Sequence, residues 1–98
     1  MDNQAIAERL MAYARHLNGH DGNLYRRRAY RRAAEILLRL DRPVESIIAE
    51  QGRKGLEELP GIGEHLAYTI EGLVRDGEFR TLTRGEKPVK FELTVSSN

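Results

Sequence analysis

Hydrophobic side chains recur at the spacing of an α-helix in the first part of the chain. A first helix is predicted by one apolar face, made of Ile6, Leu10, Tyr13, Ala14 and Leu17. Glycines and turn-forming residues at 18–23 end this helix. A second helix is expected over about residues 24–40, with arginines on one side. Its other side is apolar and is expected to be buried: Ala29, Ala33, Ile36, Leu37 and Leu40.

Shorter helical segments follow, separated by residues that break helices. We expect a third helix at 44–51 that ends at Gly52, a one-turn helix at 54–59, a hairpin at 60–63 and a last long helix at about 64–76. Gly77 stops the last helix, and Phe79 and Leu82 are expected to fold back on the core. The pattern therefore predicts an all-α fold, a compact bundle of four main helices plus a one-turn helix.

The end of the chain has a different pattern. Apolar residues alternate in "KPVKFELTVSSN", residues 87–98, which is the period of a β-strand. No partner strand is predicted elsewhere, and an isolated strand cannot satisfy its own backbone. We therefore expect one domain at residues 1–84 and a tail at 85–98 that is disordered or begins a further region.

Composition narrows the class of protein. No apolar run approaches the roughly 20 residues needed to span a bilayer, and no signal peptide is apparent. The absence of cysteine excludes disulfides, thiolate zinc sites and cysteine nucleophiles. His16 and His20 have a metal-ligand spacing, but no third ligand completes a set. We expect a cytoplasmic monomer with no metal, no cofactor and no membrane partner.

Charge is unevenly distributed, although the formal net charge is only +1. Residues 9–34 hold seven arginines and one acid, whereas residues 35–80 hold six basic and ten acidic residues. Five of the arginines lie in "RRRAYRR", residues 26–32. Like charges four residues apart on a helix repel, so this cluster is a poor solvating pattern and indicates an anionic partner.

The hairpin offers a second site for an anion. In "LPGIG", Pro60 sets φ for the turn, and Ile62 can plug the core beneath it. Gly61 and Gly63 are expected to be required by a positive φ or by close backbone approach. Backbone N–H groups of a glycine turn that opens a helix can bind a phosphate, supported by the helix dipole. The same residues can also form an ordinary turn.

Two longer segments carry a resemblance to a known family. "LEELPGIGEHLAYTIEGLV" resembles a helix-hairpin-helix motif. Together with "YRRRAYRRAAEIL" before it and "LVRDGEFRTL" at its end, it resembles the N-terminal 8-kDa domain of family X DNA polymerases (DNA polymerase beta-like) over about residues 3–84. The resemblance implies DNA binding through backbone phosphates without sequence specificity, at gaps or 5′-phosphate ends in DNA repair.

The resemblance also implies which residues contact DNA. Tyr30 takes the position of the family's pocket tyrosine, Arg26 takes a basic pocket position, and His65 and Thr81 take two further basic positions. The expected DNA-binding residues are Arg26, Arg27, Arg28, Tyr30, Arg31, Arg32, Gly61, Ile62, Gly63 and His65.

Catalysis is not expected. Animal members of the family remove a 5′-deoxyribose phosphate through a lysine Schiff base, and the matching position here is Thr69. A Schiff base requires a primary amine, and none of the lysines lies on the predicted helix at 64–76. Two alternatives remain: a deoxyribose-phosphate or abasic-site lyase that uses another amine, and a protein-interaction module whose arginines bind an acidic partner.

Overall fold

The computed structural model describes residues 1–17, 24–82 and 88–90 of the chain. The elements in order are α1 (Asn3–His16), α2 (Leu24–Arg39), α3 (Val44–Gln51), α4 (Arg53–Glu57), α5 (Glu64–Asp76), β1 (Arg80–Leu82) and β2 (Pro88–Lys90). The predicted all-α fold is confirmed, and α4 is the expected one-turn helix. Two short strands are added to it.

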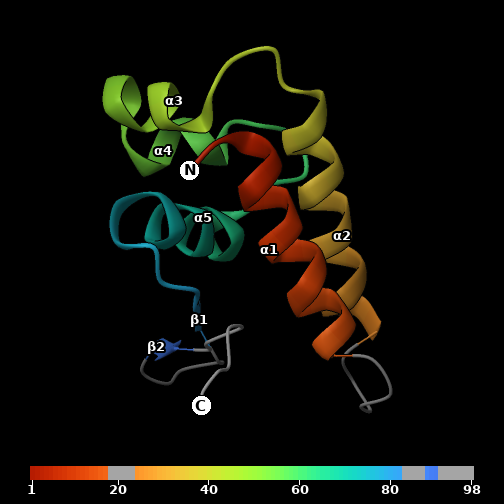
Figure 1. Ribbon diagram of the computed structural model, residues 1–98. Helices are drawn as coiled ribbons and strands as arrows, with labels where there is room; N and C mark the ends of the chain where they lie inside the picture. The colour runs from red at the N-terminus through yellow and green to blue at the C-terminus, as the bar shows by residue number, and fades with distance from the viewer. Residues whose placement is uncertain (18–23, 83–87, 91–98) are drawn as a thin grey trace.

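The helices pack around the pair formed by α1 and α2. These two helices run antiparallel side by side, α5 lies beside α1, and α4 packs against α3 and α5 (Figure 1). Small side chains allow the close approach of α1 to α2, since Ala7, Ala14, Ala33 and Ala34 are all buried.

Side-chain caps fix where the helices begin. Asp2 accepts a hydrogen bond from the N–H of Ala5 over 2.8 Å, which caps α1. Asn3 accepts from the N–H of Val44 over 2.8 Å and donates to the Arg42 carbonyl oxygen over 2.9 Å. Through these bonds, Asn3 joins the start of α1 to the start of α3, which is 41 residues away along the chain.

Three aromatic rings form the centre of the core. The Tyr13 ring lies 4.8 Å from the Tyr30 ring and 4.7 Å from the Phe79 ring, measured between centroids. Phe79 is 2% exposed, so its expected return to the core is confirmed. The cluster joins α1, α2 and the segment after α5.

The pairing of β1 with β2 corrects one expectation. Thr81 is opposite Val89 in this antiparallel pair, with Arg80 opposite Lys90. The expectation that the alternating pattern has no partner strand is therefore wrong for residues 88–90. Gly77 ends α5 in the left-handed conformation and turns the chain, so that residues 80–82 are extended and available for pairing. Residues 83–87 and 91–98 lie outside the described part, so the disorder expected for the tail stays a prediction at residues 85–87 and 91–98.

Thr69 ties β1 to α5. Its side chain is 0% exposed, and its hydroxyl lies 2.6 Å from the Arg80 carbonyl oxygen and 3.2 Å from that of His65. A hydroxyl has one proton to donate, and the Arg80 carbonyl is the nearer acceptor. Thr69 thus fixes the first residue of β1 against the helix.

Thr69→Val is expected to lower the free energy of unfolding by about 1–2 kcal/mol, because an isosteric side chain leaves a buried carbonyl without its donor. For a domain of this size, each kcal/mol lowers the melting temperature by about 4–8 °C. Thermal denaturation followed by circular dichroism measures this. Ser46→Ala, which removes a hydroxyl on α3, is the control. Equal melting temperatures for Thr69→Val and the wild type would contradict the role given to Thr69.

Candidate nucleic-acid interface

The hairpin at residues 60–63 is held from beneath by Ile62. Its side chain is buried in the core, and its N–H donates to the Leu59 carbonyl oxygen over 3.0 Å. Ile62 was expected among the contact residues and also as the plug of the turn. The structure places its side chain in the core, not on the surface.

The two hairpin glycines differ in their backbone conformation. Gly61 has φ +95°, and a Cβ there would lie 2.5 Å from Cδ1 of Ile36 and 3.5 Å from Cδ of Arg32. Both expected reasons for glycine, positive φ and close approach, are confirmed at Gly61. Gly63 has φ −89°, and a Cβ there would meet no atom within 4 Å. The expectation that the fold requires glycine at position 63 is therefore wrong. The one reason that remains for a glycine there is that it leaves the backbone accessible to a ligand.

The start of α5 is open to an anion. Gly63 is the N-cap and makes no side-chain capping bond, and the first intrahelical bond runs from the Ala67 N–H to the Gly63 carbonyl over 2.9 Å. The N–H groups of the first turn have no acceptor within the helix. They lie at the positive end of its dipole.

A groove of about 550 Å³ lies between this hairpin and α2. We call it the hairpin groove. Its lining includes Tyr25, Arg26, Arg28, Tyr30, Arg32, Gly61, Gly63 and His65. All but the first of these were expected DNA-binding residues.

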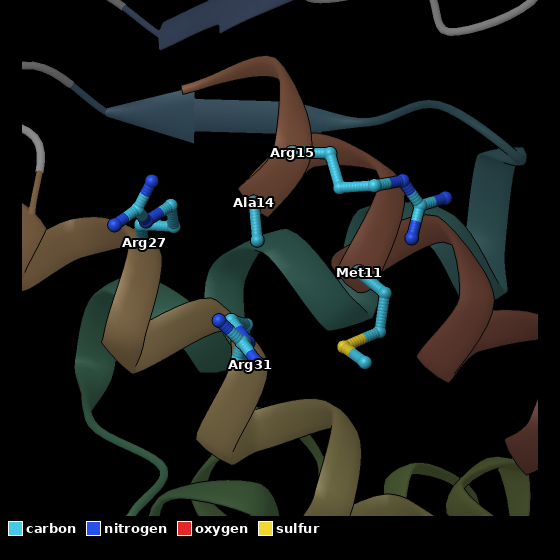
Figure 2. A pocket seen from close by; sticks show the side chains of 5 residues that line it. All are labelled: Met11, Ala14, Arg15, Arg27 and Arg31. Atoms are coloured by element: carbon cyan, nitrogen blue, oxygen red, sulfur yellow. The ribbon is translucent and has the colours of Figure 1, made fainter. Parts of the chain in front are cut away.

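Arg27 and Arg31 lie elsewhere. A helix turns about 100° per residue, so positions 28 and 32 project on one flank of α2 and positions 27 and 31 on another. Arg27 and Arg31 line a separate groove against α1, with Met11, Ala14 and Arg15 (Figure 2). The structure therefore divides the arginine cluster, which the sequence treated as one surface.

Matching the chain to known families adds to this geometry. The family profile of the helix-hairpin-helix domain matches residues 1–79. The chain belongs to the helix-hairpin-helix domain family. Such domains generally bind DNA without sequence specificity. A comparison with curated proteins found no significant match.

In this helix-hairpin-helix domain, Tyr30 forms the floor of the hairpin groove. It is 1% exposed, and its hydroxyl lies 3.4 Å from Nε2 of His65. Burial raises the pKa of Tyr30, so its hydroxyl stays protonated. Arg26 donates to the hydroxyl of Tyr13 over 3.5 Å, which positions its guanidinium beside this floor.

His65 does not supply a positive charge at neutral pH. Burial, assisted by the charge of Arg26, lowers the pKa of His65 below its usual value of about 6.5. The resemblance gave His65 a basic position, but the imidazole is neutral near pH 7 and can only exchange hydrogen bonds with a ligand.

Arginines differ sharply in their ion pairing across the helix-hairpin-helix domain. Arg42 pairs with Glu50, Arg75 with Glu71 and Arg80 with Asp76. Among the residues that the structure describes, Arg28, Arg31 and Arg32 form no such pair. The uncompensated positive charge is thus concentrated on α2.

Sequence reasoning missed Tyr25 as a site residue, along with Ala29 and Leu66 of the same lining. Tyr25 is 81% exposed at the start of α2, between the arginines and the hairpin. An aromatic beside a run of arginines was the available signal, but exposure could not be read from the sequence.

Residues 1–17 and 24–80 contain no candidate metal site and no candidate membrane-spanning helix. No group of three or more histidine and acidic side chains there could hold a metal ion. Likewise, no helix within the described ranges is long and apolar enough to cross a membrane. His20 and the side chain of Thr81 lie outside what is described.

Gly61→Ala is expected to lower the free energy of unfolding by about 1–3 kcal/mol, because alanine would combine an unfavourable positive φ with a clash against Ile36. Gly63→Ala is the matched control and is expected to unfold within about 0.5 kcal/mol of the wild type. Urea denaturation measures both. Equal losses in the two variants would contradict the distinction between these glycines.

Proposed function

We propose that this helix-hairpin-helix domain binds DNA through backbone phosphates in the hairpin groove, at gaps or 5′-phosphate ends exposed during DNA repair. One observation carries the proposal: the open N-terminus of α5 faces the same groove as Arg26, Arg28 and Arg32. Neutral donors and cationic side chains converge there, which is the arrangement that a phosphate group requires.

The two arms of the groove have different tasks in this proposal. The N–H groups at Gly63 and in the first turn of α5 hold one phosphate at short range, because the space beside Gly63 is open: a Cβ there would meet no atom within 4 Å. Arg28 and Arg32 attract the neighbouring phosphates along the strand. Since phosphates carry no sequence information, binding of this kind is the same for every sequence.

Preference for a gap or an end is supported by Tyr25. Its exposed ring can stack on an unpaired base, and such stacking is worth about 1–3 kcal/mol per base and tolerates any base. A terminal 5′-phosphate also carries more charge than an internal phosphodiester. Both features favour DNA with an interrupted strand, as in the 8-kDa domains that the sequence resembles.

We propose binding without catalysis. The lyase alternative needs an amine, but Thr69 is fully buried and its hydroxyl is engaged with the Arg80 carbonyl. The only lysine among residues 1–80 is Lys54, which is on α4 and does not line the hairpin groove.

The dependence of affinity on salt tests the DNA-binding proposal. If two to four arginines meet phosphates, log affinity for a gapped duplex should fall against log salt with a slope of about −2 to −4. Arg28→Ala and Arg32→Ala are each expected to reduce that slope by about one and to weaken all sequences alike. Fluorescence anisotropy at several salt concentrations measures this.

Arg75→Ala is the control, because Arg75 lies outside the hairpin groove and pairs with Glu71. A flat salt response, or equal effects of Arg75→Ala and Arg28→Ala, would show that the hairpin groove is not the DNA surface.

Borohydride trapping tests the absence of catalysis. No covalent adduct is expected between the protein and DNA that carries an abasic or 5′-deoxyribose-phosphate site, because no lysine is among the described residues that line the groove. A polymerase-type lyase serves as the positive control. An adduct mapped to Lys54 or to the N-terminal amine would support the lyase alternative instead.

A further inference from the structure

A second groove lies on another flank of α2, about 100° around the helix from the flank that faces the hairpin. It has a volume of about 370 Å³ and is lined by Met11, Ala14, Arg15, Arg27 and Arg31. Arg27 and Arg31 project from α2 on one side of the hollow, and Met11 and Arg15 come from α1 on the other (Figure 2). Among the residues that the structure describes, all the charged residues of this lining are arginines. We call it the α1–α2 groove.

The placement of these arginines is unfavourable for an isolated helix. Arg27 and Arg31 are one turn apart on one flank, as Arg28 and Arg32 are on the other, and like charges at this spacing repel. The first turn of α2 contains no acidic residue. It is also the positive end of the helix dipole, where cations are destabilising. Anions on both flanks would relieve the repulsion within both pairs. An anion in the hairpin groove alone would leave the repulsion between Arg27 and Arg31.

The width of α2 suits two separate anionic strands. A helix with its side chains is about 10–12 Å across, and the major groove between the two backbones of a DNA duplex is about 12 Å wide. Arginines that project from two flanks about 100° apart on one helix can therefore reach two backbones at the same time.

We propose that the N-terminal half of α2 lies between two DNA backbones. Arg28 and Arg32 contact one backbone in the hairpin groove, and Arg15 and Arg31, together with Arg27, contact the other in the α1–α2 groove. Met11 and Ala14 give the second groove an apolar floor, which suits the sugar face of a nucleotide. The proposal rests on the DNA binding proposed for the hairpin groove, and it adds a second strand and a second set of residues.

An acidic peptide is the other occupant that the charge could attract. The surface continues past Met11 and Arg15 along the same pair of helices to Glu8 and Leu38. A long acidic segment that followed this path would meet the carboxylate of Glu8, whereas a DNA backbone that crosses only the arginine-lined part would not. The charged residues described in the α1–α2 groove are all arginines, and the groove lies next to the proposed DNA-binding flank. DNA is therefore a better match for this groove than an acidic peptide.

Two DNA probes distinguish contact with one DNA backbone from contact with two. A 5′-phosphorylated thymidine tetranucleotide can occupy the hairpin groove, and a gapped duplex with the same 5′-phosphate offers a second backbone. Arg15→Ala/Arg31→Ala is expected to lower affinity for the gapped duplex about tenfold and to reduce the salt slope by about two. Affinity for the tetranucleotide should stay within about twofold of the wild type. Fluorescence anisotropy with labelled DNA measures all of these.

Arg39→Ala/Arg75→Ala is the matched control, because it removes the same charge from exposed positions outside both grooves. It is expected to change neither affinity by more than about twofold. If Arg15→Ala/Arg31→Ala lowered affinity for both probes equally, or for neither, the proposed contact with a second backbone would be wrong. A loss of binding to labelled polyglutamate with unchanged binding to both DNA probes would also overturn it, in favour of an acidic protein.

Arg28→Ala/Arg32→Ala separates failure of this inference from failure of the proposed function. Loss of tetranucleotide binding in this variant supports the hairpin groove independently of the other flank. Retained tetranucleotide binding would contradict the hairpin groove itself, on which the two-backbone arrangement depends. All variants are compared by thermal denaturation first, and exposed arginines on a helix surface should leave the melting temperature nearly unchanged.

Discussion

The packing of Tyr30 against Tyr13 and Phe79 is the contact on which both the fold and the groove depend. Its ring fills the space where α2 meets α1 and the segment after α5, and aromatic pairs at such distances are worth about 0.5–1.5 kcal/mol beyond the area they bury. The hydroxyls of the two tyrosines contact residues that line the groove, since Tyr30 meets His65 and Tyr13 accepts from Arg26. A shift of this cluster would therefore move α5 and the arginines relative to each other.

A second constraint holds the hairpin at a fixed height above α2. Gly61 lies against the end of the Ile36 side chain, which would have to shift to admit a methyl group, while Ile62 anchors the turn in the core. The first-turn amides of α5 consequently stand at a set position relative to Arg32. Because these donors are in place before any ligand arrives, little ordering is needed on binding.

The sequence predicted the helices well because their signals are local. Apolar spacing located α1, α2 and α5, and Pro60 with Gly61 marked the hairpin. The site was predicted less completely, because its geometry depends on contacts between elements. Helical spacing separates Arg31 from Arg32 by 100°, but only the packing of α1 and of the hairpin shows that each flank has its own groove. The neutral state of His65 arises from burial, and the pairing of β2 with β1 arises from the turn at Gly77; neither is visible in a local pattern.

Thr69 shows how the same helix position can serve either structure or chemistry. A lysine there would place an amine where the hydroxyl now meets the Arg80 carbonyl, and burial would impose a large cost on its charged form. Threonine instead closes the space and fixes β1 to α5, which keeps Phe79 beneath Tyr30. The interaction that supports the aromatic cluster thus occupies the position that a lyase of this kind would need for its nucleophile. This is consistent with the proposal that the groove holds DNA without a reaction of its own.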